Sequence, residues 1–280
     1  MSIDAESLAG YISAEIGLEF TGIGGRNGEG NRYFELLPAG HPAGQTFALR
    51  LIVGWRSVEI QFRLGTFAGE LLNAMGAADF VRREAFCAVL RVCHEAGAEV
   101  IFTLNNVTSD PRDDSTWCVP WRSLSLIIKK GMLNINEGDS ESDMVHFRLW
   151  TARSLAAIFA LLPLEVEEDE GEVSDFDGFP EGGKTRIEVN AYERDRRNRA
   201  VALAIHGFSC KACNLDLGEI YGPAAAGLIE VHHVVPVSMI GTGYIINPQK
   251  DLLPLCPNCH AVTHRRTPPY SLDEVKEMLR

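Results

Sequence analysis

The sequence has no apolar run long enough to span a bilayer. Its longest run, 155–164, has about half of the roughly 20 residues that a membrane helix needs, and it contains Pro163. The first residues, 1–17, show no basic segment followed by an apolar core, so we recognise no secretory signal. We therefore expect a cytoplasmic protein without a membrane partner, in which the cysteines are thiols or metal ligands and not disulfides.

Basic residues are also scarce. The chain has 26 Lys and Arg against 38 Asp and Glu, which gives a net charge of −12. Segment 165–177 alone holds eight acidic residues and no basic one, whereas the chain from Glu181 onward carries twelve basic and eleven acidic residues. Because the acidity is concentrated in one segment, it does not exclude a nucleic-acid partner for the remainder of the chain.

A phosphate-binding P-loop and internal repeats are missing as well. The glycine-rich stretch 22–30 lacks the Gly-Lys-Ser/Thr ending of a P-loop, so we expect no nucleotide cofactor. We interpret this stretch as a flexible turn, with a DNA-contacting loop as the alternative.

The order of apolar residues predicts a mixture of helices and strands. Helices are expected over 1–17, 66–75, 79–96 and 151–162, and strands over 47–53, 58–63, 100–104, 124–128 and 145–150. The mixture indicates an α+β fold class with an N-terminal domain at 1–164, an acidic linker at 165–180 and a C-terminal domain at 181–280. We expect the linker to be extended and solvated, or to imitate nucleic acid in a basic groove.

Two groups of residues are candidates for DNA contacts. Trp117 and Trp121 flank a proline and would stack on bases, or else pack beneath a loop. Four arginines precede an apolar helical pattern that Gly207 ends, and they would contact phosphates or form a solvated helix face. These arginines are Arg194, Arg196, Arg197 and Arg199.

The strongest motif consists of two Cys-x-x-Cys pairs. Cys210 and Cys213 form the first pair, and Cys256 and Cys259 form the second. Each such turn lets two sulfurs reach one ion, and two turns together supply the four thiolates of a tetrahedral zinc site. Such a closed site leaves no position for substrate, so we expect a structural Zn²⁺. Four unrelated structural thiols are the alternative.

Four histidines accompany the second cysteine pair. His260 and His264 are four residues apart, so a helix would place both imidazoles on one face, where they can share a metal ion. His232 and His233 are adjacent on a predicted strand, 228–233, and therefore point to opposite sides. One of them can complete a three-histidine ligand set while the other acts as a base, which suits phosphodiester hydrolysis. A second zinc site, or histidines satisfied within a core, is the alternative.

Together these motifs resemble the HNH endonuclease domain with its ββα-metal finger, in the McrA-like, restriction-type branch. The matching segments are 206–213, 229–236 and 251–260, together with His264 and a final predicted helix at 271–279. The resemblance covers about 100 of the 280 residues, within 181–280.

The resemblance implies a role for each matched residue. His232, His260 and His264 would bind the catalytic divalent ion, which would be Mg²⁺, Mn²⁺ or Ni²⁺. His233 would be the general base, and the four cysteines named above would hold the structural Zn²⁺.

Two further residues have expected roles beside these ligands. The family usually has Asn at the position of Asp251, whose carboxylate still offers an acceptor to orient the base histidine. Asn247 lies nearby as a substitute for it. Glu230 is expected to orient a ligand histidine without itself binding the ion.

The resemblance thus implies a bacterial, metal-dependent endonuclease that cuts double-stranded DNA in restriction or phage defence. Its N-terminal domain would select modified or otherwise marked DNA. One active site cuts one strand, so a double-strand break would require a homodimer or two sequential events. Two alternatives stay open: a catalytically inactive zinc-containing nucleic-acid-binding protein, and an HNH nuclease whose N-terminal domain is a protein-interaction or regulatory domain.

Overall fold

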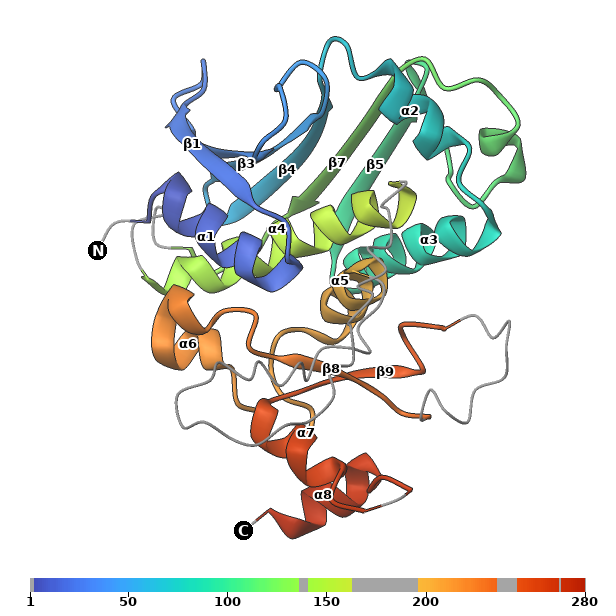
Figure 1. Ribbon diagram of the computed structural model, residues 1–280. Helices are drawn as coiled ribbons and strands as arrows, with labels where there is room; N and C mark the ends of the chain where they lie inside the picture. The colour runs from blue at the N-terminus through green and yellow to red at the C-terminus, as the bar shows by residue number, and fades with distance from the viewer. Residues whose placement is uncertain (1–2, 136–140, 163–195, 236–245, 267, 280) are drawn as a thin grey trace, which may run out of the picture.

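The computed structural model describes residues 3–135, 141–162, 196–235, 246–266 and 268–279 (Figure 1). The predicted linker at 165–180, and Arg194, lie outside this part of the chain. The helices are α1 (Ala5–Ile16), α2 (Gly69–Gly76), α3 (Phe80–Glu95), α4 (Glu141–Leu161), α5 (Arg196–His206), α6 (Leu217–Tyr221), α7 (Pro257–Thr263) and α8 (Leu272–Met278), with 3-10 turns η1 (Asp114–Trp117) and η2 (Gly222–Ala225). The strands are β1 (Phe20–Arg26), β2 (Arg32–Pro38), β3 (Phe47–Gly54), β4 (Ser57–Leu64), β5 (Ala98–Leu104), β6 (Val107–Thr108), β7 (Leu124–Lys130), β8 (Glu230–His233) and β9 (Leu252–Leu255).

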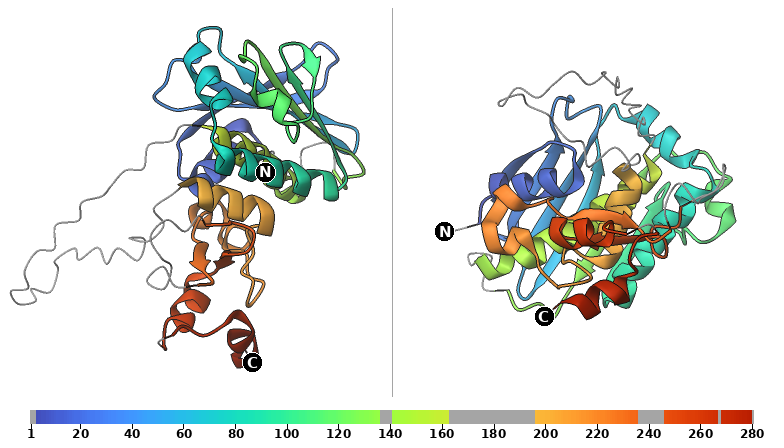
Figure 2. Two further views of the ribbon diagram at one scale, coloured as in Figure 1. Left: turned by 90° about the vertical axis from the view of Figure 1, so that its right-hand side faces the viewer. Right: turned by 60° about the horizontal axis from the view of Figure 1, so that its bottom comes forward.

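Seven strands form one antiparallel sheet in the order β1–β2–β3–β4–β7–β5–β6. Successive side chains alternate across it, so that Leu49, Leu51 and Val53 of β3 are all buried on one face. In the sheet register, Leu51 pairs with Ile60 of β4, and Ile60 pairs with Ile128 of β7. Helices α1, α3 and α4 cover this face (Figure 2). We call the sheet, together with these three helices and α2, the N-terminal unit. The predicted α+β class is confirmed.

Helix α4 lies between the sheet and α5 (Figure 1). It is apolar on most sides, with Phe147, Trp150, Leu155 and Ile158 buried, as expected for a helix covered by both neighbours. The predicted strand at 145–150 is wrong, because these residues belong to α4. A short apolar run fits both the two-residue period of a strand and the 3.6-residue period of a helix. Here the buried residues continue at helical spacing into the next turns.

The glycine-rich stretch is a strand over its first half, so the predicted turn is confined to residues 27–31. β1 pairs along its whole length with β2 and lies against the start of α1. A Cβ at Gly22 would lie 2.0 Å from the carbonyl oxygen of Ala5. Glycine is therefore required there by the close approach of the helix to the strand.

Helix α5 belongs to two hydrophobic cores. Its Ala200, Val201 and Ala204 pack into the core beneath the sheet, whereas Ala202 and Leu203 join a second core formed with β8, β9 and the cysteines. The predicted C-terminal domain is thus joined to the N-terminal unit through packed helices and not only through the segment between them.

The second core supports a small strand–strand–helix arrangement. β8 and β9 form an antiparallel pair in which His232 lies opposite Leu253, and α7 follows β9 directly. The predicted final helix is confirmed as α8, which begins with a capping box between Ser271 and Glu274. None of the helices in the described part of the chain combines the length and apolar character needed to cross a bilayer.

Candidate metal centres

The first cysteine pair lies on a tight turn directly after α5. Gly207 ends the helix with a positive φ of 83°, which glycine adopts without strain. The Cys210 amide then donates to the carbonyl of Leu215, and the Asn214 amide donates to the carbonyl of Cys210. This turn presents the sulfurs of Cys210 and Cys213 on the same side.

The second cysteine pair is placed by the start of α7. Cys256 is the N-cap residue, and Cys259 lies one turn later in the helix. The Lys211 amide donates to the carbonyl of Pro254 at 2.9 Å, which ties the first turn to the end of β9. The backbone therefore brings the two Cys-x-x-Cys pairs together.

The four sulfur atoms form a compact cluster. All lie within 4.8 Å of one another, and the sulfurs of Cys213 and Cys256 are 3.7 Å apart. Tetrahedral zinc with bonds of about 2.3 Å places its sulfurs about 3.8 Å from one another. The spacing fits one zinc ion, and the predicted gathering of these cysteines is confirmed.

The thiols of this cluster titrate unequally. Burial acts to raise the pKa of Cys210, but backbone amides donating to its sulfur outweigh burial and lower that pKa to about 7. Burial, with the neighbouring cysteines, raises the pKa of Cys256 and of Cys259. Four adjacent thiolates therefore need a cation between them, and a divalent ion would supply that charge.

The second candidate centre consists of three histidines from two elements. His232 comes from β8, His260 from α7, and His264 from the residue that ends α7. One ring nitrogen of each lies within 4.8 Å of the others, and the ring centroids are 4.7 to 5.4 Å apart. Because Cys256 and Cys259 lie at the start of α7, the position of the cysteine cluster also bears on the positions of His260 and His264.

A carboxylate supports this histidine cluster. Glu230, two residues before His232 on β8, contacts Nδ1 of His260. This contact leaves Nε2 of His260 as the nitrogen available to an ion, and a carboxylate on the far nitrogen makes an imidazole a better ligand. Glu230 thus contacts one of the three histidines, while its expected role in orienting a metal ligand stays a prediction.

The protonation of the histidines fits a ligand set. His232 is 8% exposed, and burial, followed by the nearby His260, His264 and His233, lowers its pKa to about 4. Burial and His260 also lower the pKa of His264, while Glu230 opposes that shift. His232 is therefore neutral at physiological pH and can offer a lone pair to a cation.

His233 lies next to His232 on β8 and is half-buried. Neighbouring residues of a regular strand point to opposite faces, and His233 is not part of the group that His232 forms with the other two histidines. Asp251 lies just before β9, opposite the end of β8, and its carbonyl accepts from the Val234 amide at 2.8 Å. The structure thus brings the expected base and its expected orienting residue to the same end of the strand pair.

The loop that carries Asp251 is held by its own side chains. Oδ2 of Asp251 accepts from the Asn247 amide at 2.7 Å, while Oδ1 of Asn247 accepts from the amides of Gln249 and Lys250. The side chains of Asn247 and Asp251 therefore both stabilise this turn. His206, at the end of α5, also contacts this loop, with its Nε2 3.3 Å from the carbonyl oxygen of Pro248.

The tryptophan candidates for base stacking are corrected by the structure. Trp117 and Trp121 are 8% and 4% exposed and pack against each other with ring centroids 5.0 Å apart. Their indole nitrogens donate to the carbonyls of Pro111 and Thr116. Both rings belong to the core beneath the sheet, so neither presents a face to a base.

The arginine candidates for phosphate contact differ from one another. Arg199 is corrected by the structure, because its guanidinium points inward and donates to the carbonyls of Gly227 and Ile229. Arg197 is half-buried, and its charge acts on Arg82 of α3. The side chain of Arg196 lies outside the described part.

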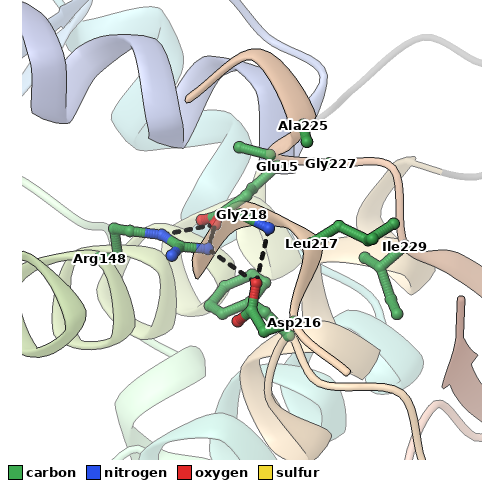
Figure 3. Close-up of a pocket in the computed structure, with 10 residues that line it drawn as sticks. Glu15, Arg148, Asp216, Leu217, Gly218, Ala225, Gly227 and Ile229 are labelled. Atoms are coloured by element: carbon green, nitrogen blue, oxygen red, sulfur yellow. Dashed lines mark hydrogen bonds and ion pairs between the residues drawn. The ribbon is translucent and has the colours of Figure 1, made fainter. Parts of the chain in front are cut away.

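Sequence reasoning missed a buried ion-pair junction between the two cores. Arg148 of α4 binds Glu15 of α1, with 2.8 Å between Nε and Oε1, and its Nη2 lies 3.8 Å from Oδ1 of Asp216 (Figure 3). Glu15 and Arg148 are almost fully buried. The sequence contained one indication of this junction, because Glu15 lies on the apolar face of α1 with Leu8 and Ile12. Its partners, however, are distant in the sequence.

No family model, no curated protein and no solved structure matches this chain.

Proposed function

We propose that this protein is a metal-dependent endonuclease of the HNH type that hydrolyses phosphodiester bonds in double-stranded DNA. The observation that carries the proposal is the convergence of His232, His260 and His264, together with the contact between Glu230 and His260. A separate four-cysteine cluster, two of whose members lie at the start of the same helix, can supply the rigidity, so the histidines need not serve as a structural zinc site. The assignment to restriction or phage defence rests on the resemblance of the motifs alone.

The donor set is suited to a catalytic divalent ion. Three imidazole ligands leave positions open for water and phosphate, unlike four thiolates, which close the coordination sphere. When bound, a Mg²⁺, Mn²⁺ or Ni²⁺ ion would stabilise the charge that develops on the phosphate and on the leaving oxygen. His232, His260 and His264 would hold this ion, and Glu230 would keep the ring of His260 in place.

His233 is the residue proposed to move the proton. Imidazole exchanges protons near neutral pH, and His233 lies beside the ligand set without belonging to it. It would take a proton from the attacking water, with Asp251 fixing its ring. In-line attack opposite the O3′ leaving group would then produce 5′-phosphate ends.

A nicking assay tests this function. Supercoiled plasmid is incubated with zinc-loaded protein and Mg²⁺, Mn²⁺ or Ni²⁺, and the wild type is compared with His233→Ala. We expect the variant to lose about 10²–10⁴-fold in rate. His94→Ala, at an exposed histidine on α3, is the matched control and should nick as fast as the wild type.

Two results would contradict the proposal. The first is wild-type nicking no faster than that of His233→Ala in every metal. The second is DNA binding without cleavage, which would favour a zinc-containing nucleic-acid-binding protein.

The role of the N-terminal unit in choosing DNA is tested by comparing the cleavage and binding of plain and modified duplexes by the whole 280-residue chain. Equal cleavage and equal affinity would favour a protein-interaction or regulatory role.

A further inference from the structure

Arg199 makes two hydrogen bonds immediately before the strand that carries the histidines. Its Nη2 donates to the carbonyl oxygens of Gly227, at 3.0 Å, and Ile229, at 2.9 Å. β8 begins at the next residue, Glu230. One guanidinium nitrogen therefore fixes the two carbonyls that lead into β8.

The geometry of the histidine cluster depends on how β8 is placed. Within this strand, Glu230 contacts His260 and His232 meets the other two ligand histidines. β8 has four residues, and β9 is its only strand partner among the described residues. A two-stranded pair of this length is only marginally stable by itself. A shift at Ile229 would therefore displace the carboxylate and the ligand together.

The same segment is held from its other side by α1. Gly227 has a φ of +78°, and a Cβ there would lie 2.0 Å from the carbonyl oxygen of Ala14. The chain before β8 thus passes directly against α1 of the N-terminal unit. Arg199 itself extends from α5 next to Ala200, which is buried in the core beneath the sheet. Both sides of this contact are therefore anchored in the N-terminal unit.

The buried ion-pair junction reinforces this arrangement. Glu15, Arg148 and Asp216 share a small cavity of about 10 Å³ with Gly227 and Ile229 (Figure 3). The charge of Arg199 also acts on Glu15 and opposes the effect of burial on its pKa. Charged groups from α1 and α4 thus line the cavity beside the segment that leads into β8, and Arg199 of α5 binds that segment directly.

We infer that Arg199 is a positioning residue that holds β8 on the N-terminal unit and thereby sets the three-histidine centre. This inference deepens the proposed function, on which it rests for the identity of the metal centre. It replaces the expectation that Arg199 contacts a DNA phosphate. It also means that the N-terminal unit contributes to metal affinity, in addition to any role in selecting DNA.

Metal binding by full-length variants tests the inference. Protein with zinc on its cysteines is titrated with Co²⁺, and the visible spectrum of the second ion is recorded for the wild type, Arg199→Met and Arg199→Lys. We expect Arg199→Met to lower Co²⁺ affinity about ten- to hundredfold, as loss of a residue supporting the ligands does. The Arg199→Lys variant should recover part of the loss, because one ammonium has donors for both carbonyls. The Arg91→Met variant, at an exposed arginine on α3, is the matched control.

The outcomes are separable. Unchanged Co²⁺ affinity and spectrum in Arg199→Met, with weaker DNA binding and a smaller salt dependence, would overturn the inference and restore a phosphate contact. If Arg199→Met does not retain its zinc, the same titration is made with Arg199→Lys and Arg199→Gln. Wild-type Co²⁺ affinity in both of these variants would also overturn the inference. A wild type that binds the second ion but never nicks DNA would remove the proposed function and leave the inference standing. A wild type that binds no second ion would remove both.

Discussion

Glu230 on β8 and His260 on α7 are joined by a contact between the carboxylate and Nδ1. The contact connects the strand that carries His232 to the helix that leads through His260 to His264. One acid therefore links α7 to β8 and determines which nitrogen of His260 would face a bound ion.

Replacing Glu230 by Gln should weaken the histidine centre without affecting the cysteine centre. An amide keeps an acceptor oxygen but lacks the charge that makes His260 a stronger ligand, so we expect Co²⁺ or Ni²⁺ affinity to fall about ten- to hundredfold. Calorimetric titration of zinc-loaded protein measures this change. The Glu219→Gln variant, at an exposed acid on α6, should bind like the wild type. Equal affinity in Glu230→Gln and Glu219→Gln would show that Glu230 has no supporting role.

Replacing Cys213 by Ser should remove the structural ion. With one thiolate lost, we expect one equivalent of zinc fewer per chain and loss of the fold around β8, β9 and α7, because zinc binding supplies folding free energy. Zinc content by mass spectrometry and a thermal melt with and without chelator measure the effect. The Cys118→Ser variant, at an exposed cysteine outside the cluster, is the control. Full zinc content in Cys213→Ser would contradict the four-cysteine site.

Replacing Arg148 by Met should destabilise the protein at pH 8. The change leaves Glu15 buried without its guanidinium, so we expect the free energy of unfolding to fall by about 3–5 kcal/mol. Urea unfolding measures this, and adding Glu15→Gln should restore much of the loss. Arg112→Met breaks an exposed pair with Asp110 that solvent screens, so it should leave the free energy of unfolding nearly unchanged. Similar losses in the two variants would argue against a stabilising junction.

The junction should also make stability depend on pH. Burial raises the pKa of Glu15 from 4.5 to about 7, against the opposing effect of Arg148. Between these values the native state binds more protons than the unfolded state, so its stability falls as pH rises. We expect the unfolding free energy of the wild type, relative to Glu15→Gln, to decrease by about 3 kcal/mol from pH 4.5 to 7.5. Urea unfolding across this range measures it, and a constant difference between the two proteins would contradict the raised pKa.

The sequence was informative where chemistry depends on local spacing. The turns around Cys210 and Cys256, and the helical spacing of His260 and His264, follow from residues within one or two turns of the chain. The β3–β4 hairpin and helices α1, α2 and α3 were predictable for the same reason. The run at 145–150 was misread, because a short apolar segment fits a strand and a helix equally well until its neighbours are known.

By itself, then, the sequence determined which side chains could bind metal and that they form two kinds of candidate ligand group, since sulfur and imidazole spacing is a local property. Tertiary structure alone decided that Trp117 and Trp121 are core, that Arg199 points toward β8, and that Arg148 meets Glu15 and Asp216. These outcomes depend on which faces of α4 and α5 become buried, and burial is settled only when segments far apart in the chain pack together.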